Sequence, residues 1–353
     1  MGMPRYIEID EFLNQSLTLP VIDVRAPAEF SQGHFPGAIN LPLFDDNERA
    51  EIGTLYKQQG REKSLLRGLD IVGPKMKSMA QSGLEIAAGQ PVLVHCWRGG
   101  MRSRSLAWLL EQVEIQTLVL QGGYKAFRSW TLASFKSSLP LVVLSGLTGS
   151  GKTGQLKQLA ALNEQVVDLE QLANHRGSAF GGIGQGDQPT NEQFENELAI
   201  ELLKTDKSKR IWVEDESRNI GFNRLPHHFF DQLRSAPAIF MEVDVQVRAE
   251  LIERDYGGLE SSELAAAIER IAKRLGGQNM KRATECLEGG NLQQCIGILL
   301  GYYDKLYLAN KDKLPRETFV NMTTSQPESK AASQELIKLA LAIDQKASPV
   351  EAV

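Results

Sequence analysis

The sequence has few cysteines and histidines and no long apolar run, and these shortages exclude several classes of protein. Its 353 residues include only three cysteines, Cys96, Cys286 and Cys295, which form neither a disulfide framework nor a spaced metal set. The five histidines are scattered, so we expect no metal site. No apolar stretch approaches the length of a membrane-spanning helix, and the first residues lack the basic start and apolar stretch of a signal peptide. We therefore expect a reduced, cytoplasmic protein with no membrane contact.

Positive charge is also in short supply. The chain has 39 lysines and arginines against 44 acidic residues, giving a formal net charge of -5. This charge balance excludes the class of proteins that coat nucleic acid with a surface that is basic throughout. It leaves room for a local basic patch, because recognition depends on where the charge lies rather than on its total.

The order of apolar segments predicts two α/β domains, each built on a parallel sheet, because short buried strands alternate with helices. In the first domain we expect strands at 20–24, 91–95 and 117–120 and a helix at 103–114. In the second we expect strands at 141–145, 165–169, 210–214 and 238–243, and only helices beyond about residue 245. The predicted boundaries are 1–130 for the first domain, 131–140 for a linker, 141–245 for the second core and 246–345 for a helical C-terminal part.

A cysteine lies in a loop between a predicted strand and helix. The loop consists of Cys96, Trp97, Arg98, Gly99, Gly100, Met101 and Arg102. Backbone N–H groups of such a turn point inward, so we expect an anion cradle with Cys96 as the catalytic residue at its floor. Arg98 and Arg102 are expected to stabilise a thiolate, and the glycines to let the backbone approach a bound anion. Such a thiolate attacks phosphorus or carries sulfur or selenium, although an isolated cysteine at a strand end is often only a small buried hydrophobe.

Two further segments resemble the rhodanese box, DVRAPAEF at 23–30 and GHFPGAINLP at 33–42. The resemblance implies an N-terminal rhodanese-like parallel-sheet domain, of which some members are sulfurtransferases and others phosphatases. Five residues separate Cys96 from Arg102, as in the phosphatases, whereas typical single-domain sulfurtransferases have a shorter loop. The wider loop has room for a larger atom or a phosphorus-bearing donor.

The string GLTGSGKT at 146–153 is a complete phosphate-binding P-loop that follows a predicted strand and precedes a helix. It predicts a P-loop NTPase-like α/β domain in which backbone amides cradle two linked phosphates, Lys152 neutralises their outer charge and Thr153 is placed to bind Mg²⁺. A nucleotide and any other diphosphate ester satisfy these groups equally. The expected binding residues are Gly146, Gly149, Ser150, Gly151, Lys152 and Thr153.

Two acids follow the predicted strand at 210–214 and are candidates for the second metal-binding motif of a P-loop protein. These residues are Glu214 and Asp215. Acids at a strand end are also commonly solvated without any function, so this motif is less specific than the P-loop.

Together, the rhodanese box, the cysteine loop and the downstream P-loop resemble the bacterial tRNA 2-selenouridine synthases. The resemblance covers about residues 5–310 without a departure at any motif position. Further matching segments are RAEIGTLYKQQG at 49–60, DLEQLANHRGSAF at 168–180, EDESRNIG at 214–221 and LGGQN at 275–279.

The family resemblance implies a two-step exchange at the wobble uridine of certain tRNAs. First, 2-thiouridine is S-alkylated with the geranyl group of geranyl diphosphate, and then selenium from selenophosphate replaces the geranylated sulfur. It implies these two substrates and no tightly bound cofactor, with Mg²⁺ as a candidate ion and a selenophosphate synthetase as the supplier of selenium. Placing geranyl diphosphate at the P-loop is a hypothesis, because the sequence equally permits a nucleotide there.

A tRNA substrate requires local positive or polar surface on this acidic chain. The loop after the strand at 165–169 is the strongest candidate for contact with the substrate, since a polar loop beside a P-loop commonly contacts substrate. The basic residues near 270 share one face of a predicted helix, which is equally typical of a solvated surface. The candidates are Asn174, His175, Arg176, Ser178, Arg270, Lys273 and Arg274.

Two other functions remain open at this point. The length of the cysteine loop also fits a cysteine-dependent phosphatase fused to an NTPase, although the other family motifs do not. The chain is alternatively a non-catalytic sulfur-carrier or tRNA-binding module regulated by a nucleotide. The presence of Cys96, Lys152 and the acidic strand end argues against a non-catalytic module.

Overall fold

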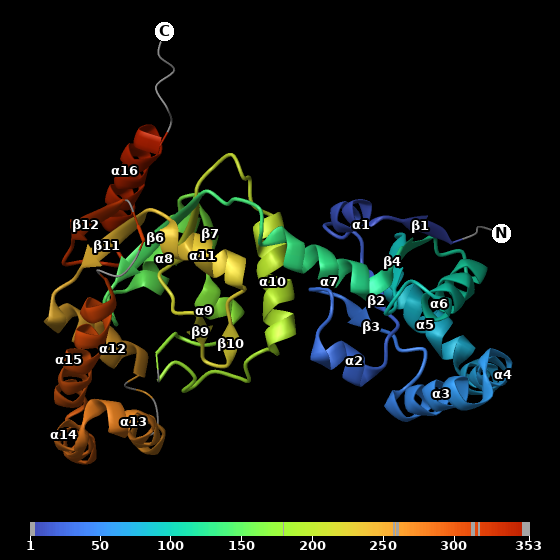
Figure 1. Cartoon of the computed structure of the whole chain (residues 1–353), viewed down its shortest axis with the longest axis horizontal. Helices are drawn as coiled ribbons and strands as arrows, with labels where there is room; N and C mark the ends of the chain where they lie inside the picture. The colour runs from blue at the N-terminus through green and yellow to red at the C-terminus, as the bar shows by residue number, and fades with distance from the viewer. Residues whose placement is uncertain are drawn as a thin grey trace, which may run out of the picture. The chain divides into compact units, whose positions relative to one another are not determined.

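The computed structural model describes residues 4–178, 180–256, 258, 261–311, 315–316 and 318–347 (Figure 1). The chain divides into two compact units. The first contains Met1–Ser134 and Glu195–Ala199, and the second contains Phe135–Phe194 and Ile200–Val353. Within the described ranges, no helix is long and apolar enough to cross a membrane.

The first unit is built on a sheet of five parallel strands in the order β1-β5-β4-β2-β3. The strands are β1 Arg5–Ile7, β2 Val21–Asp23, β3 Ile39–Asn40, β4 Val92–His95 and β5 Thr117–Leu120. The helices are α1 Ile9–Gln15, α2 Pro27–Gln32, α3 Asp46–Gln59, α4 Arg61–Val72, α5 Met76–Ala87, α6 Met101–Gln112 and α7 Gly123–Ser134, with a 3₁₀ turn η1 at Gly73–Lys75.

Both faces of this sheet are covered, as the continuous apolar strands predict. Val92 and Val94 of β4 pack in one core cluster with Met79 of α5 and Leu106 of α6. Leu93, which alternates with them along the strand, is also fully buried. A strand buried on both faces is typical of a parallel sheet between helices. The predicted α/β class with a parallel sheet is therefore confirmed for this unit.

The second unit has its own sheet of five parallel strands, in the order β12-β11-β6-β8-β7. These strands are β6 Leu141–Gly146, β7 Gln165–Val167, β8 Ile211–Glu214, β11 Ala238–Glu242 and β12 Phe319–Thr323. A short antiparallel ribbon pairs β9 Asn219–Ile220 with β10 Asn223–Arg224. The helices that follow β6 are α8 Lys152–Ala161, α9 Leu169–Leu172, α10 Asn191–Leu203, α11 His227–Ser235, α12 Val245–Tyr256, α13 Ser261–Leu275, α14 Gly277–Glu288, α15 Leu292–Lys311 and α16 Lys330–Ala347.

The expectation of only helices beyond residue 245 is wrong at β12, which pairs in parallel with β11 from Phe319 to Thr323. This strand lies at the edge of the sheet, and Met322 is its only buried residue. An edge strand needs no continuous apolar run, because one of its sides has no neighbouring strand. The sequence FVNMT therefore lacks the pattern that reveals the central strands.

Helices α13, α14 and α15 form a helical part with an apolar core of its own. In α13 the buried residues Leu264, Ile268, Ile271 and Leu275 recur at helical spacing, so they share one face. They pack in one cluster that also includes Cys295 of α15. This arrangement confirms the helical C-terminal part and places an apolar helix face beside the P-loop core.

Candidate functional site

The cysteine loop of the first unit closes around the sulfur of Cys96, which directly follows β4. Only 3% of Cys96 is exposed. The backbone N–H of Gly100 donates to its Sγ over 3.2 Å, and Ser103 Oγ lies 3.3 Å from the same sulfur. Ser103 also donates to the Gly100 carbonyl over 3.1 Å, so the first turn of α6 holds the loop. The sulfur thus lies at the floor of a loop that directs a backbone donor at it, which suits an anionic sulfur or a bound anion.

The loop backbone packs against the turn that begins α7. Tyr124 N donates to the Cys96 carbonyl over 2.8 Å. A Cβ at Gly123 would lie 2.3 Å from that carbonyl oxygen, and a Cβ at Gly99, where φ is 65°, would lie 2.7 Å from Leu120 O. Both glycines are thus required by close backbone contacts within the protein. Gly99 thus has a packing role in the loop, and its expected approach to a bound anion remains a prediction.

The remaining loop residues differ in what they contact. Trp97 and Met101 are 38% and 45% exposed, and Arg98 is exposed as well. Arg102 instead donates to Glu29 over 2.5 Å. Burial raises the pKa of Glu29, but the hydrogen bond and charge of Arg102 outweigh it, so this pKa is lowered. The charge of Arg102 is therefore matched by Glu29 rather than by the Cys96 sulfur.

A buried charged pair lies beside the loop and was missed as a functional element. Arg25 donates to Asp23 over 2.6 Å, and neither side chain is more than 1% exposed. The Arg25 guanidinium also lies 3.7 Å from the ring centroid of Tyr124 and 6.0 Å from that of Trp97. Burial raises the pKa of Asp23, but His95 and Arg25 outweigh it, so this pKa is lowered. Both residues of this pair lie in the rhodanese box, so that motif could have indicated them.

The P-loop of the second unit joins β6 to α8. Lys152 Nζ donates to the Gly146 carbonyl over 3.1 Å. Gly149 and Gly151 both have a φ of 76°, a conformation that favours glycine. A Cβ at Gly149 would lie 2.6 Å from Ile252 Cδ1, so the loop packs tightly against α12. The turn brings its backbone amides and Lys152 to one cavity.

A cluster of carboxylates faces the P-loop. Thr153 Oγ1 donates to Glu170 over 3.0 Å, and Glu170 N donates to Glu214 Oε1 over 2.8 Å. Glu214 is 2% exposed, and within the described chain its Oε2 has no hydrogen-bond partner. Burial raises the pKa of Glu214 well above its ordinary value and that of Glu216 to about 8, and the neighbouring carboxylates contribute to both shifts. This end of the cavity therefore favours protons or a cation near its acids.

Asp215, the other candidate acid, belongs to a separate cluster of hydrogen-bonded side chains. Arg316 donates to it over 2.5 Å, and only 1% of the arginine side chain is exposed. The Asp215 carboxylate also accepts from Ser145 over 2.6 Å and from Tyr307 over 3.1 Å. These bonds connect β6, α15 and the segment before β12 to the end of β8. Of the two acids, Glu214 alone has an oxygen without a partner in the described part of the chain.

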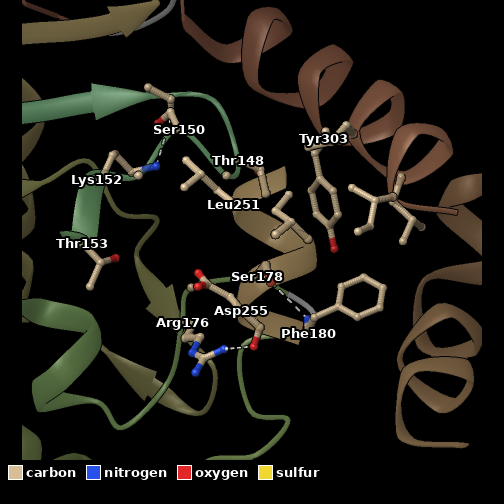
Figure 2. Close-up of a pocket in the computed structure, with 18 of the residues that line it drawn as sticks. Thr148, Ser150, Lys152, Thr153, Arg176, Ser178, Phe180, Leu251, Asp255 and Tyr303 are labelled. Atoms are coloured by element: carbon tan, nitrogen blue, oxygen red, sulfur yellow. Dashed lines mark hydrogen bonds between the residues drawn. The ribbon is translucent and has the colours of Figure 1, made fainter. Parts of the chain in front are cut away.

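The P-loop opens into a cavity of about 590 Å³ that has two chemically different ends (Figure 2). One end is polar and contains the P-loop, Lys152, Thr153 and the carboxylates. The other end lies among α12, α13, α14 and α15 and is apolar. Figure 2 shows Leu251, Tyr303 and Phe180 around this part of the cavity. The apolar lining also includes Ile252, Leu264, Ile268, Leu287, Leu292, Cys295, Ile296, Leu299 and Leu300.

Comparisons with known proteins decide the family. The model of the rhodanese-like domain matches residues 8–129, and that of the tRNA 2-selenouridine synthase AAA domain matches residues 139–336. The tRNA 2-selenouridine synthase of Pseudomonas fluorescens strain Pf0-1 is 36% identical, over 86% of this chain and 90% of the relative. The chain belongs to the tRNA 2-selenouridine synthase family. Synthases of the same name from Nitrosomonas europaea and Shewanella denitrificans are 35% and 36% identical, over 82% of this chain in each case and over 89% and 87% of the relatives.

The family assignment makes the chain an enzyme, and its two chemical sites lie on the two matched domains. The cysteine loop belongs to the rhodanese-like match, and the cavity belongs to the synthase AAA match. Within the described ranges, no three or more His, Cys, Asp or Glu side chains are arranged to hold a metal ion by themselves.

The candidate residues after β7 separate into two groups. Arg176 and Ser178 line the cavity, and Arg176 donates to the Asp255 carbonyl over 3.3 Å. Asn174 instead donates to the Asp187 carbonyl over 3.1 Å and does not line the cavity. Burial, with a contribution from Arg270, lowers the pKa of His175. A role in substrate contact at the cavity is therefore supported for Arg176 and Ser178.

The basic candidates on α13 remain predictions for a tRNA surface. Arg270, Lys273 and Arg274 are all exposed and do not line the cavity.

The apolar end of the cavity was not predicted from the sequence, because its residues come from four helices and the pattern of each helix alone indicates only an ordinary amphipathic helix. Only the helices' shared proximity to the P-loop shows that they enclose a binding space.

Proposed function

We propose that this enzyme converts the wobble 2-thiouridine of tRNA to 2-selenouridine in two steps, S-geranylation with geranyl diphosphate and then selenium transfer from selenophosphate. Family membership supports tRNA selenation. The two-ended cavity supports the alkylation step, and the cysteine loop supports the selenium step. The cavity and the cysteine loop lie on different domains, so the two steps can fail separately.

We assign geranyl diphosphate to the P-loop because the polar end and the apolar end belong to one continuous cavity. A diphosphate suits the backbone amides and Lys152, as it does in any P-loop. An isoprenoid chain suits the apolar end, where each buried CH₂ contributes about 0.8 kcal/mol. The ribose and base of a nucleotide carry polar groups, which that end does not match because its lining is largely Leu and Ile. A prenyl diphosphate therefore fits both ends, and a nucleotide fits only one.

The P-loop residues would act on the leaving group during alkylation. The thiouridine sulfur attacks the first carbon of the geranyl chain, the carbon–oxygen bond to the diphosphate breaks, and the base loses its N3 proton. Lys152 and the loop amides would stabilise the negative charge that develops on the departing pyrophosphate. Mg²⁺ would add to this stabilisation, and Thr153 fits a hard cation of that kind together with Glu214 Oε2, which has no hydrogen-bond partner among the described residues.

The cysteine loop would serve the second step. Alkylation converts the sulfur into a better leaving group. The selenium of selenophosphate would add to the same carbon of the base and the sulfur would depart as geranyl thiol. Water would take the phosphoryl group as the selenium–phosphorus bond breaks, which gives inorganic phosphate. Cys96 lies beneath the backbone donor of Gly100, and five residues separate it from Arg102, as in the phosphatases of the rhodanese group. A selenophosphate synthetase is the proposed supplier of that donor.

The test separates the two steps with the Lys152→Ala variant. This variant should bind geranyl diphosphate about 2–3 kcal/mol more weakly, the scale for losing a charged hydrogen-bonding partner. It should stall at 2-thiouridine, and pre-geranylated tRNA with selenophosphate should restore 2-selenouridine. Mass analysis of tRNA nucleosides measures each product.

An exposed lysine of the same unit provides the matched control. Among the described residues, Lys281 of α14 makes one long, exposed ion pair, with Glu285 at 3.8 Å, so Lys281→Ala should behave as wild type. If Lys152→Ala still fails on pre-geranylated tRNA, the P-loop also serves selenation and the division of labour is wrong. If ADP displaces geranyl diphosphate at equal concentration, a nucleotide is the better ligand for the cavity.

A further inference from the structure

The most exposed large apolar side chain in the described part of the chain is Phe222, in the turn between β9 and β10 (Figure 1). It is 93% exposed, whereas the next most exposed, Leu17, reaches 60%. A single exposed apolar side chain is ordinary in itself, but a ring this exposed leaves its face open to a partner that stacks on it.

The turn that carries Phe222 is held in place by one glutamine. Gln188 Nε2 donates to the carbonyls of Ala173 and Ile220 over 2.9 and 3.0 Å and to Asn223 Oδ1 over 2.9 Å. The backbone N–H of Phe222 donates to Gln188 Oε1 over 2.8 Å. The glutamine amide thus fixes both sides of the turn. The ring is exposed on an ordered support and not on a loose loop, so little entropy is lost when a partner binds it.

The position of the turn connects it to the cavity. Glu216 and Ser217 line the cavity, and β9 begins two residues later. A Cβ at Gly221 would lie 2.7 Å from the ring of His175, so the turn packs against the loop that carries Arg176 and Ser178 into the cavity. The turn therefore lies beside one wall of the cavity.

The residues around Phe222 indicate which kind of partner fits. Its neighbours in the turn are glycine and asparagine, so the ring is an isolated aromatic and not the centre of an apolar patch, as a protein interface would have. Arg218 and Arg224 lie on either side of it in the sequence; Arg224 is exposed and Arg218 is half-buried. An exposed ring between arginines matches single-stranded RNA, whose bases stack on aromatic side chains while its phosphates contact cations.

We propose that Phe222 stacks on an unpaired base of the tRNA anticodon loop, with Arg218 and Arg224 contacting the adjacent phosphates. The inference rests on the proposed tRNA function and adds a binding contact to it. It assigns the ribbon a role in holding the loop nucleotides while the target base reaches the cavity.

The test measures equilibrium binding of an anticodon stem–loop RNA that contains wobble 2-thiouridine. Phe222→Ala should weaken binding roughly 5- to 150-fold, the range that corresponds to one stacked base. Phe222→Tyr should bind within about twofold of wild type, whereas Phe222→Leu, apolar but without a ring, should bind as weakly as the alanine variant. The fluorescence of Phe222→Trp should be quenched by the stem–loop and not by a duplex without unpaired bases.

The control is Leu341→Ala, which removes a 48% exposed apolar side chain from α16 of the same unit and should leave binding unchanged. Equal binding by wild type and Phe222→Ala would overturn the proposal, and so would full binding by Phe222→Leu. Unchanged RNA binding with altered self-association of Phe222→Ala would assign the ring to a protein contact. If wild-type protein does not bind the stem–loop at all, the proposed function fails first.

Discussion

Glu216 stands among carboxylates at the polar end of the cavity, and the cost of ionising it there can be measured. A Cβ at Gly177 would lie 2.6 Å from a Glu170 oxygen and 2.7 Å from a Glu216 oxygen, so the two acids converge on the same glycine. Burial and, after it, the charge of Glu170 raise the pKa of Glu216 from 4.5 to about 8, although Lys152 opposes the shift. Replacing Glu216 by glutamine removes the ionisation and keeps the shape.

The sign of the pH effect follows from the direction of this shift. The folded protein holds the Glu216 proton more tightly than the unfolded chain does, so the stabilisation is complete below about pH 4.5 and is lost as the pH rises through about 8. At about 1.4 kcal/mol per pKa unit, the loss is at most about 5 kcal/mol. The pKa of Glu170 is also raised by burial, so Glu170 contributes to the same fall in stability. The free energy of unfolding of wild type should therefore fall over this interval.

Urea unfolding at about pH 5, 7 and 9 measures the effect. The free energy of unfolding of Glu216→Gln should exceed that of wild type by an amount that grows with pH. Glu269→Gln, which changes an exposed glutamate of α13, should follow wild type at every pH. Parallel curves for wild type and Glu216→Gln would show that Glu216 is ionised in the folded protein without penalty, and the repulsion argument would be refuted.

Three other outcomes are expected. Cys96→Ser should stop the reaction at the S-geranyl nucleoside with tRNA affinity intact, and 2-selenouridine in its product, detected by mass analysis, would contradict the role of the sulfur. Arg316→Ala should lower the free energy of unfolding by about 3–5 kcal/mol, since it strands Asp215 in a nearly buried site; a loss below about 1 kcal/mol would contradict this. Glu29→Gln should lower the thermal midpoint by a few degrees because it unpairs Arg102, and Glu51→Gln, whose pair with Arg67 is exposed, should not.

Local sequence signals predicted the two loops and most central strands. The P-loop residues are adjacent in sequence, and the strand that precedes them is a continuous apolar run, so both are visible without any tertiary information. The same holds for Cys96, whose loop lies between β4 and α6 as predicted. The roles of these residues in catalysis remain predictions until the variants are measured.

Features that depend on distant segments could not be predicted in the same way. Arg316 lies 101 positions from Asp215, and Arg102 lies 73 positions from Glu29. No spacing rule links such pairs, because only the completed fold brings them together. The edge strand β12 was missed because Met322 is its only buried residue, so its sequence has no continuous apolar run. The sequence alone therefore located the reactive groups better than the charges that balance them.

The position of β12 has a consequence for synthesis of the protein on the ribosome. Met322 of this strand and Leu336 of α16 belong to the same apolar core as Val142 and Leu144, which lead into the P-loop. The first unit is almost wholly encoded before residue 135 and can fold while the rest is being made. The P-loop core instead waits for nearly the last residues of the chain. During that interval its apolar strands are exposed to aggregation and to chaperones, so premature termination near residue 310 should yield a folded first unit attached to an incomplete second one.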